Sequence, residues 1–121
     1  MSDNDKLCPL KHLANTFSGK WKLPIICILS CDNYSAKRYS VLKRRLGNIT
    51  NLMLAQSLRE LESSGLVHRE QYNEIPPRVE YSLTERGKSA LTFINYAAEW
   101  AVNDLRENSN QIFCSKCIIT N

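Results

Sequence analysis

The stretch YSVLKRRLGNITNLMLAQSLRELESSG, residues 39–65, contains two helical patterns separated by a short turn. In the second pattern Leu54, Leu58 and Leu61 recur at i, i+4 and i+7, which predicts a helix with one apolar face. Thr50 is a good N-cap residue for this helix, and the final glycine of the stretch is a good C-terminal stop. Two helices joined by a tight turn are the organisation of a helix-turn-helix.

The face of the second helix opposite its leucines carries residues that can contact bases. It presents an amide, a guanidinium, a methyl-rich side chain and small residues, namely Leu52, Ala55, Gln56, Arg59 and Ser63. Amide and guanidinium groups make bidentate hydrogen bonds to base edges in the DNA major groove. We therefore expect this helix, called the reading helix below, to lie in that groove. An isolated surface arginine more often makes an ordinary ion pair. The helix-turn-helix pattern around Arg59 reverses that preference and favours a contact with DNA.

The helix before the turn is short and basic. Tyr39, Leu42 and Leu46 recur at helical spacing, and Gly47 ends the pattern. Cations on or beside this helix are expected to contact phosphates, although a solvated basic face is the plainer alternative. They are Lys37, Arg38, Lys43 and Arg44.

A hairpin follows the reading helix. Residues 66–72 and 78–83 are predicted to be strands, and the turn at 73–77 contains two prolines that stiffen its tip. Arg69 and Arg78 are expected to reach phosphates beside the reading helix. The order helix, turn, helix, hairpin predicts a winged helix-turn-helix, mainly α-helical with a small β-hairpin wing.

Three further helices complete the expected fold. The first begins at Cys8-Pro9, because proline is favourable at the first helical position. The second, at about residues 20–30, is apolar nearly all round and should form the buried centre. The last, at about residues 84–107, is apolar on more faces than one domain can cover, which implies a second subunit.

Composition limits the function classes. A chain of 121 residues with 43% hydrophobic content should form one domain, and we expect an arm at 1–7, a domain at 8–107 and a tail at 108–121. The absence of an apolar run of about 20 residues and of a secretion signal predicts a cytoplasmic protein. Residues 6–59 hold ten basic residues and one acidic residue, so a positive surface should attract nucleic acid.

Several segments of the chain resemble HxlR-type winged-helix regulators. They occur in the same order across about residues 8–106, and they are Cys8-Pro9, Gly19-Lys20-Trp21-Lys22, Leu58-Arg59-Glu60-Leu61-Glu62, Gly65-Leu66-Val67 and the run from Pro76 to Thr84. The resemblance implies a bacterial DNA-binding homodimer, held together by its first and last helices, that acts as a repressor or activator. Leu52 departs from the family, whose members often have a polar or basic residue there.

The predicted partners are therefore double-stranded operator DNA and a second copy of the chain. The candidate DNA contacts are Lys37, Arg38, Lys43, Arg44, Asn51, Leu52, Ala55, Gln56, Arg59, Arg69 and Arg78.

The cysteines bear on the signal to which the protein responds. Five cysteines in a chain without an export signal are expected to be thiols rather than structural disulfides. Cys8 precedes a helix N-terminus, where the helix dipole favours a thiolate. The family resemblance implies a redox or electrophile switch at Cys8, with Cys114 or Cys117 of the other subunit as its partner. The alternative is that Cys8 only caps a helix and that the tail cysteines have no role.

Other function classes have weaker support. The sequence contains no P-loop, nucleophile elbow, dinucleotide fingerprint or metalloprotease helix, so we do not expect an enzyme. Cys114-x-x-Cys117 lacks the βαβ setting of thiol-exchange centres. Together with Cys8 and His12 this pair would supply four zinc ligands if the tail folded back, but nothing in the sequence shows that it does, and no metal or cofactor is expected. The alternative function is a zinc- or thiol-dependent winged-helix module that binds proteins.

Overall fold

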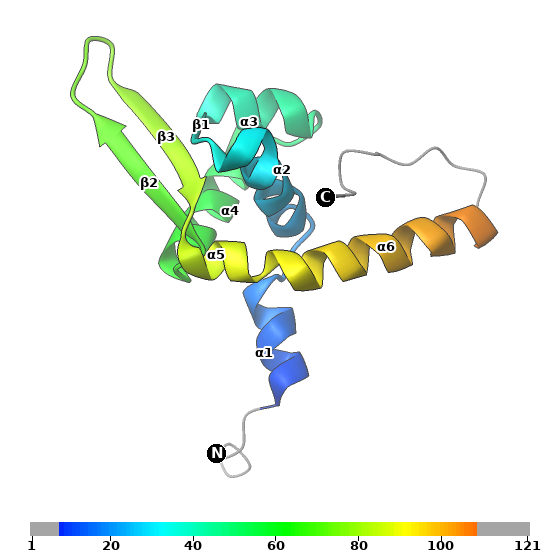
Figure 1. Ribbon diagram of the computed structural model, residues 1–121. Helices are drawn as coiled ribbons and strands as arrows, with labels where there is room; N and C mark the ends of the chain where they lie inside the picture. Colours follow the sequence, from blue (N-terminus) through cyan, green and yellow to red (C-terminus); the bar gives the residue numbers. More distant parts are fainter. Residues whose placement is uncertain (1–7, 109–121) are drawn as a thin grey trace.

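The computed structural model describes residues 8–108, which form six helices and one three-stranded antiparallel sheet (Figure 1). The helices are α1 (Pro9–Thr16), α2 (Lys22–Tyr34), α3 (Tyr39–Leu46), α4 (Asn51–Ser63), α5 (Glu85–Ser89) and α6 (Leu91–Asn108). The strands are β1 (Lys37–Arg38), β2 (Val67–Tyr72) and β3 (Arg78–Leu83), in the sheet order β1-β3-β2. The predicted winged helix-turn-helix is confirmed, with α4 as the reading helix and the β2–β3 hairpin as the wing.

The core forms around α2, which contacts α3, α4 and β3. Ile25, Ile26 and Leu29 of α2 are completely buried, as the apolar pattern of this helix predicted. Leu54 and Leu61 of α4 are equally buried. Because burial of one such side chain stabilises a fold by about 1.5–3 kcal/mol, these contacts fix which face of α4 points outward.

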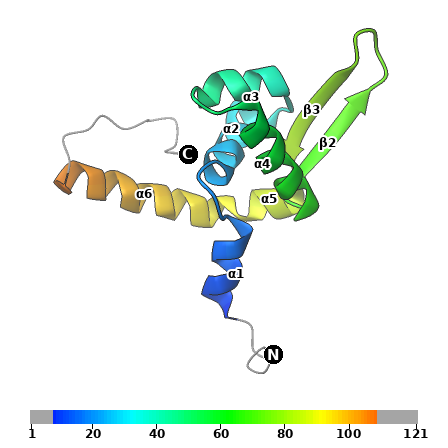
Figure 2. The ribbon, with the colours of Figure 1, turned by 180° about the vertical axis from the view of Figure 1, so that it is seen from behind.

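The two ends of α4 are held by local hydrogen bonds. The Thr50 hydroxyl accepts from the Met53 N–H at 3.1 Å, as its N-cap position predicted. At the other end Gly65 has a φ of +82°, which glycine adopts without strain, and the Leu66 N–H donates to the Leu61 carbonyl at 3.0 Å. The wing therefore begins at a fixed angle directly after the reading helix, as seen from behind in Figure 2.

The wing is a regular hairpin in which Val67 pairs with Leu83 at the base and Tyr72 pairs with Arg78 near the tip. It extends well beyond the helices in both views (Figures 1 and 2). The third strand, β1, pairs with β3 through Lys37 opposite Tyr81 and Arg38 opposite Glu80. The sequence did not predict β1, because two residues have no periodicity and their pairing depends on a strand some 40 positions away.

The final helix differs from the prediction of one continuous element. The Ala90 N–H donates to the Gly87 carbonyl at 3.2 Å, a tight turn that ends α5, and α6 begins at Leu91. The position of α5 is set by tertiary contacts: the Thr84 hydroxyl donates to the Gly65 carbonyl at 2.6 Å, and a Cβ on Gly87 would clash with the Leu66 carbonyl. Docking of α5 against the base of the wing thus interrupts the helix.

The helical backbone of α2 ends at Ser30, as predicted, because Cys31 has an extended ψ of 164°. The element runs on to Tyr34 across a kink, in which Asp32, Asn33 and Tyr34 all have positive φ values. Asparagine and aspartate tolerate this conformation better than other non-glycine residues.

Helix α1 lies outside the core, and α6 joins it through Leu91 and Ile94 of its first turn. No residue of α1 is buried, and α6 projects from the body of the fold (Figure 1). Leu10, Tyr96 and Trp100 are each about 70% exposed, with values of 72%, 70% and 69%. None of the helices within residues 8–108 is long and apolar enough to cross a membrane.

Candidate nucleic-acid interface

The outer face of α4 carries the predicted base-contacting residues. Asn51, Gln56 and Arg59 are exposed, Ala55 is half-buried, and the Leu52 side chain is 71% exposed. The structure therefore brings these five residues together on the surface opposite the buried leucines. Within residues 8–108, Arg59 makes no hydrogen bond or ion pair with another side chain, so its guanidinium is free to bind a ligand.

The Gln56 amide, in contrast, is held within the protein. Its Nε2 donates to Oε2 of Glu60 at 3.1 Å, and Oε1 of Glu60 lies 2.9 Å from Nζ of Lys22. The hydrogen bond from Lys22, followed by the one from Gln56, holds the pKa of Glu60 below its usual value. Sequence analysis did not identify Lys22 and Glu60 as site residues, since the two lie 38 positions apart and only the fold joins them.

Tyr39 connects α3 to the start of the reading helix. Its hydroxyl donates to the main-chain carbonyl of Asn51 at 3.0 Å and lies 3.3 Å from the Asn51 side-chain oxygen. Burial, followed by the charge of the neighbouring Tyr81, raises the pKa of Tyr39. The phenol therefore remains a hydrogen-bond donor at neutral pH.

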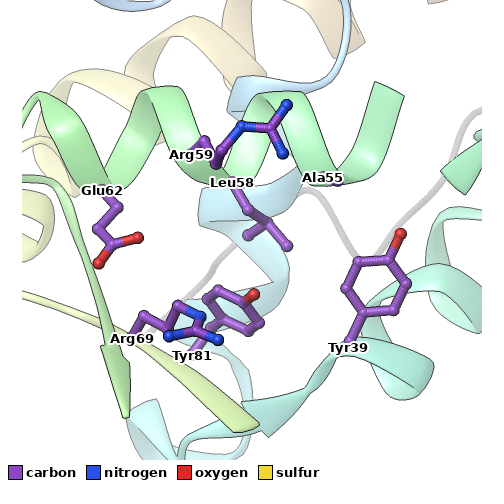
Figure 3. Close-up of a pocket in the computed structure, with 7 residues that line it drawn as sticks. All are labelled: Tyr39, Ala55, Leu58, Arg59, Glu62, Arg69 and Tyr81. Atoms are coloured by element: carbon purple, nitrogen blue, oxygen red, sulfur yellow. The ribbon is translucent and has the colours of Figure 1, made fainter. Parts of the chain in front are cut away.

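A hollow of about 400 Å³ lies between α3, α4 and the wing (Figure 3). Arg59 reaches it from α4 and Arg69 from β2, while Leu58 points into it from the core side of α4. Its lining residues are Tyr39, Ala55, Leu58, Arg59, Glu62, Arg69 and Tyr81. The two arginines make this junction between the reading helix and the wing attractive to anions.

The predicted phosphate contacts near α3 have different surroundings. Arg38 and Arg44 are exposed, whereas the half-buried Lys43 donates to the Ile49 carbonyl at 3.1 Å. Lys37 is buried, with 5% of its surface exposed, and its ammonium donates to the carbonyls of Cys31 and Ser35 at 2.8 and 2.7 Å. The prediction that Lys37 contacts DNA is therefore wrong, because its ammonium is buried and already donates to main-chain carbonyls inside the fold.

The two wing arginines also differ. Arg69 is exposed, and its contact with Gln71 is long, at 3.4 Å. Arg78 pairs with Glu74 at 2.9 Å and with Glu80 at 3.2 Å. Since two carboxylates already neutralise Arg78, we reassign it from the phosphate contacts to the internal bracing of the wing.

The candidate redox residues are only partly described. Cys8 is exposed at the N-cap of α1, whereas Cys114 and Cys117 lie outside the described residues. The possible pairing of Cys8 with the tail, and the four-ligand zinc arrangement, therefore remain hypotheses. Among residues 8–108 no three His, Cys, Asp or Glu side chains are grouped to hold a metal ion.

Comparison with known proteins agrees with this geometry. Residues 16–109 match the HxlR-like helix-turn-helix family. An uncharacterized HTH-type transcriptional regulator of Methanothermobacter thermautotrophicus is 43% identical over 113 residues, which cover 92% of this chain and 84% of that protein. The HTH-type transcriptional regulator YtcD of Bacillus subtilis, also uncharacterized, is 45% identical over 87 residues, covering 72% of this chain and 67% of YtcD.

A solved structure shows the same fold. The redox regulator HypR in its oxidized form superposes with a TM-score of 0.72 at 38% identity, over 79% of this chain and 96% of the HypR chain. These relatives are regulators rather than enzymes. With its winged helix-turn-helix and a family match over most of its length, the chain belongs to the HxlR-like helix-turn-helix family of transcriptional regulators.

Proposed function

We propose that this regulator binds operator DNA with α4 in the major groove and the wing beside it. The observation that carries the proposal is the exposed face of α4, where the unpaired Arg59 lies next to the hollow that Arg69 reaches from the wing. An arginine without an internal partner can donate two parallel hydrogen bonds to a guanine edge. Such a role requires a cytoplasmic location.

The proposed contacts divide into two groups. Asn51, Leu52, Ala55, Gln56 and Arg59 face the bases, while cations outside α4 contact the sugar-phosphate backbone. The backbone group consists of the exposed Arg38, Arg44 and Arg69 and the half-buried Lys43. Each neutralised phosphate releases counterions, so the affinity should fall steeply as salt is added.

We also propose that the active form is a homodimer built through α1 and α6. Leu10, Tyr96 and Trp100 expose large apolar surfaces on these two helices, and an apolar groove of about 200 Å³ lies between α2 and α6. A second copy would cover these surfaces and remove them from water. A two-fold dimer presents two reading helices about 34 Å apart, which matches successive major grooves on one side of the duplex.

Selection of bound fragments from the source genome tests this function. We expect enrichment of pseudo-palindromic sites, bound by a dimer with an affinity that falls linearly on a log–log plot against salt. If no fragment is enriched, or if binding is independent of salt, the DNA-binding proposal is wrong. The protein-interaction module would then be the better function.

A second candidate function is a response to oxidants through Cys8. Its thiol is exposed at the start of α1, next to the proposed dimer interface, and HypR, a redox regulator, has the same fold. An oxidant such as hydrogen peroxide would join the thiols of Cys8 and of Cys114 or Cys117 in the other subunit. Two thiols lose two protons and two electrons to form the disulfide, and the peroxide is reduced to two waters.

A further inference from the structure

Lys22, at the start of α2, places a nearly buried positive charge beside the reading helix. Its side chain is 9% exposed, and its ammonium lies 2.9 Å from Oε1 of Glu60 on α4. A charge removed from water is stable only when an opposite charge and hydrogen bonds compensate it. The partner carboxylate is therefore held in one place, although the Glu60 side chain is itself 47% exposed.

The second oxygen of Glu60 reaches the candidate base-contacting amide. Oε2 accepts from Nε2 of Gln56, one helical turn earlier, at 3.1 Å. A surface hydrogen bond at this spacing contributes little by itself, since both side chains are usually mobile. Here the acceptor is fixed by Lys22, so the chain Lys22–Glu60–Gln56 extends from the core to the outer face of α4.

This chain of contacts determines which way the amide faces. Nε2 carries two hydrogens and no acceptor, so only one of the two amide orientations can donate to Glu60. Within residues 8–108 the second N–H and the Oε1 acceptor of Gln56 make no hydrogen bond, so both remain available. Adenine is read in the major groove by such a pair, with the amide N–H donating to N7 and the amide oxygen accepting from the N6 amino group.

We propose that Lys22 and Glu60 are positioning residues that orient the Gln56 amide to recognise adenine. The inference rests on the proposed function, because it assigns a base preference to a helix that we place in the major groove. Neither Lys22 nor Glu60 needs to contact DNA. Loss of either residue should relax the base preference at the position that Gln56 contacts, rather than weaken binding to all sequences equally.

The test compares Glu60→Ala with Glu85→Ala on operator DNA. Glu85 is a suitable control because it carries the same charge, its side chain is 94% exposed on α5, its contact with Lys88 is long at 3.5 Å, and it does not line the hollow between α4 and the wing. The contacted position is the one whose preference is lost in Gln56→Ala. There we expect wild type to favour adenine over the other bases by about tenfold, Glu60→Ala by about twofold, and Glu85→Ala by the wild-type factor. Both glutamate variants should bind all sequences more tightly at low salt.

A double variant separates positioning from a general structural effect. Adding Glu60→Ala to Gln56→Ala should change the base ratio no further, because the amide that Glu60 orients is already absent. Lys22→Met should relax the preference as Glu60→Ala does, and its melting temperature is measured to check that it folds. If Lys22→Met does not fold, the comparison of the two glutamate variants still tests whether Glu60 orients the Gln56 amide.

Two results would overturn the inference while leaving the proposed function intact. One is that wild type prefers adenine at this position and that Glu60→Ala keeps the same ratio of affinities for adenine and the other bases. The other is a base ratio that falls further when Glu60→Ala is added to Gln56→Ala. A wild-type chain that prefers no DNA sequence would instead overturn the proposed function and this inference together.

Discussion

The guanidinium of Arg78 lies 4.1 Å from the centre of the Tyr72 ring, where the two strands of the wing pair for the last time before the tip. The same guanidinium pairs with Glu74 in the tip and with Glu80 on its own strand. Arg78 thus joins both strands and the turn at the far end of this hairpin. The wing is stiffened by its own side chains.

Arg78→Ala should therefore loosen the wing instead of removing a phosphate contact. Cation–π contacts at exposed sites contribute about 0.5–1 kcal/mol, and the substitution leaves two carboxylates unpaired. We expect weaker operator binding with an unchanged salt slope, together with faster amide exchange in β2 and β3. Arg69→Ala is the comparison, since it should lower the salt slope by about one unit. If Arg78→Ala and Arg69→Ala lower the salt slope equally, Arg78 contacts a phosphate.

Arg59→Ala should remove sequence preference at one position of each half-site. A bidentate contact to guanine contributes about 1–3 kcal/mol of discrimination, so specific operators should lose that much while unrelated DNA loses little. Arg44→Ala serves as the control, because an exposed cation on α3 should weaken specific and unrelated DNA by similar factors. Competition binding with matched and scrambled operators measures both variants. A uniform loss in Arg59→Ala would make it a phosphate contact.

The reading helix was predictable because its determinants are local. Thr50, the leucine spacing and Gly65 all lie within 16 residues, and the buried leucines leave Gln56 and Arg59 on the opposite face. Burial of Lys37 was not predictable, because its acceptors are main-chain carbonyls whose positions depend on the backbone conformation of residues 32–34. The partners of charged residues were the least predictable, since the Lys22–Glu60 pair depends on how α2 packs against α4.

Lys37→Met should destabilise the turn between α2 and β1. The buried ammonium donates to the Cys31 and Ser35 carbonyls, on either side of the residues with positive φ. Carbonyls left without a donor cost about 1–3 kcal/mol, which urea unfolding at pH 7 would detect. Lys20→Met, at an exposed position, should stay close to wild type.

The same residue predicts a dependence of stability on alkaline pH. Burial is the largest cause of the lowered pKa of Lys37, which reaches its usual 10.5 on unfolding. Between the folded and unfolded pKa values the unfolded chain binds the extra proton, so this group's contribution to stability rises with pH across that window and is lost as pH falls. The stability difference between wild type and Lys37→Met should therefore grow as the pH approaches 10.5. A constant difference would mean that the ammonium keeps an unperturbed pKa.

Trp100→Glu should dissociate the proposed dimer. The indole is 69% exposed on α6, and a carboxylate at this place would be buried without a partner if a second copy covered it. We expect the dimer dissociation constant to rise at least tenfold in analytical ultracentrifugation, with the melting temperature of the monomer retained. Leu52→Glu is the matched control: its side chain is 71% exposed on α4, so that variant should lose DNA binding and remain a dimer. A Trp100→Glu protein that stays dimeric would place the interface elsewhere.

Cys8→Ser should abolish any response of operator binding to oxidants. Cys8 is exposed at the N-cap of α1, a helix that buries none of its own residues, so a bond from Cys8 to the other subunit could shift α1 without disrupting the core. Such a shift would change the separation of the two reading helices and hence the operator affinity. After diamide, which takes two electrons and two protons from a pair of thiols, wild type should migrate as a covalent dimer on non-reducing gels.

The matched variants identify the thiols in that bond. Cys31→Ser should behave as wild type, because Cys31 is half-buried and its thiol donates to the Cys27 carbonyl at 3.4 Å. Cys114→Ser and Cys117→Ser, examined separately, should show which tail cysteine is the partner of Cys8. We expect oxidised wild type to differ from its reduced form in operator affinity and Cys8→Ser to show no such difference. If wild type and Cys8→Ser bind the operator equally before and after diamide, Cys8 is only a helix cap, and the regulator must respond to a different signal.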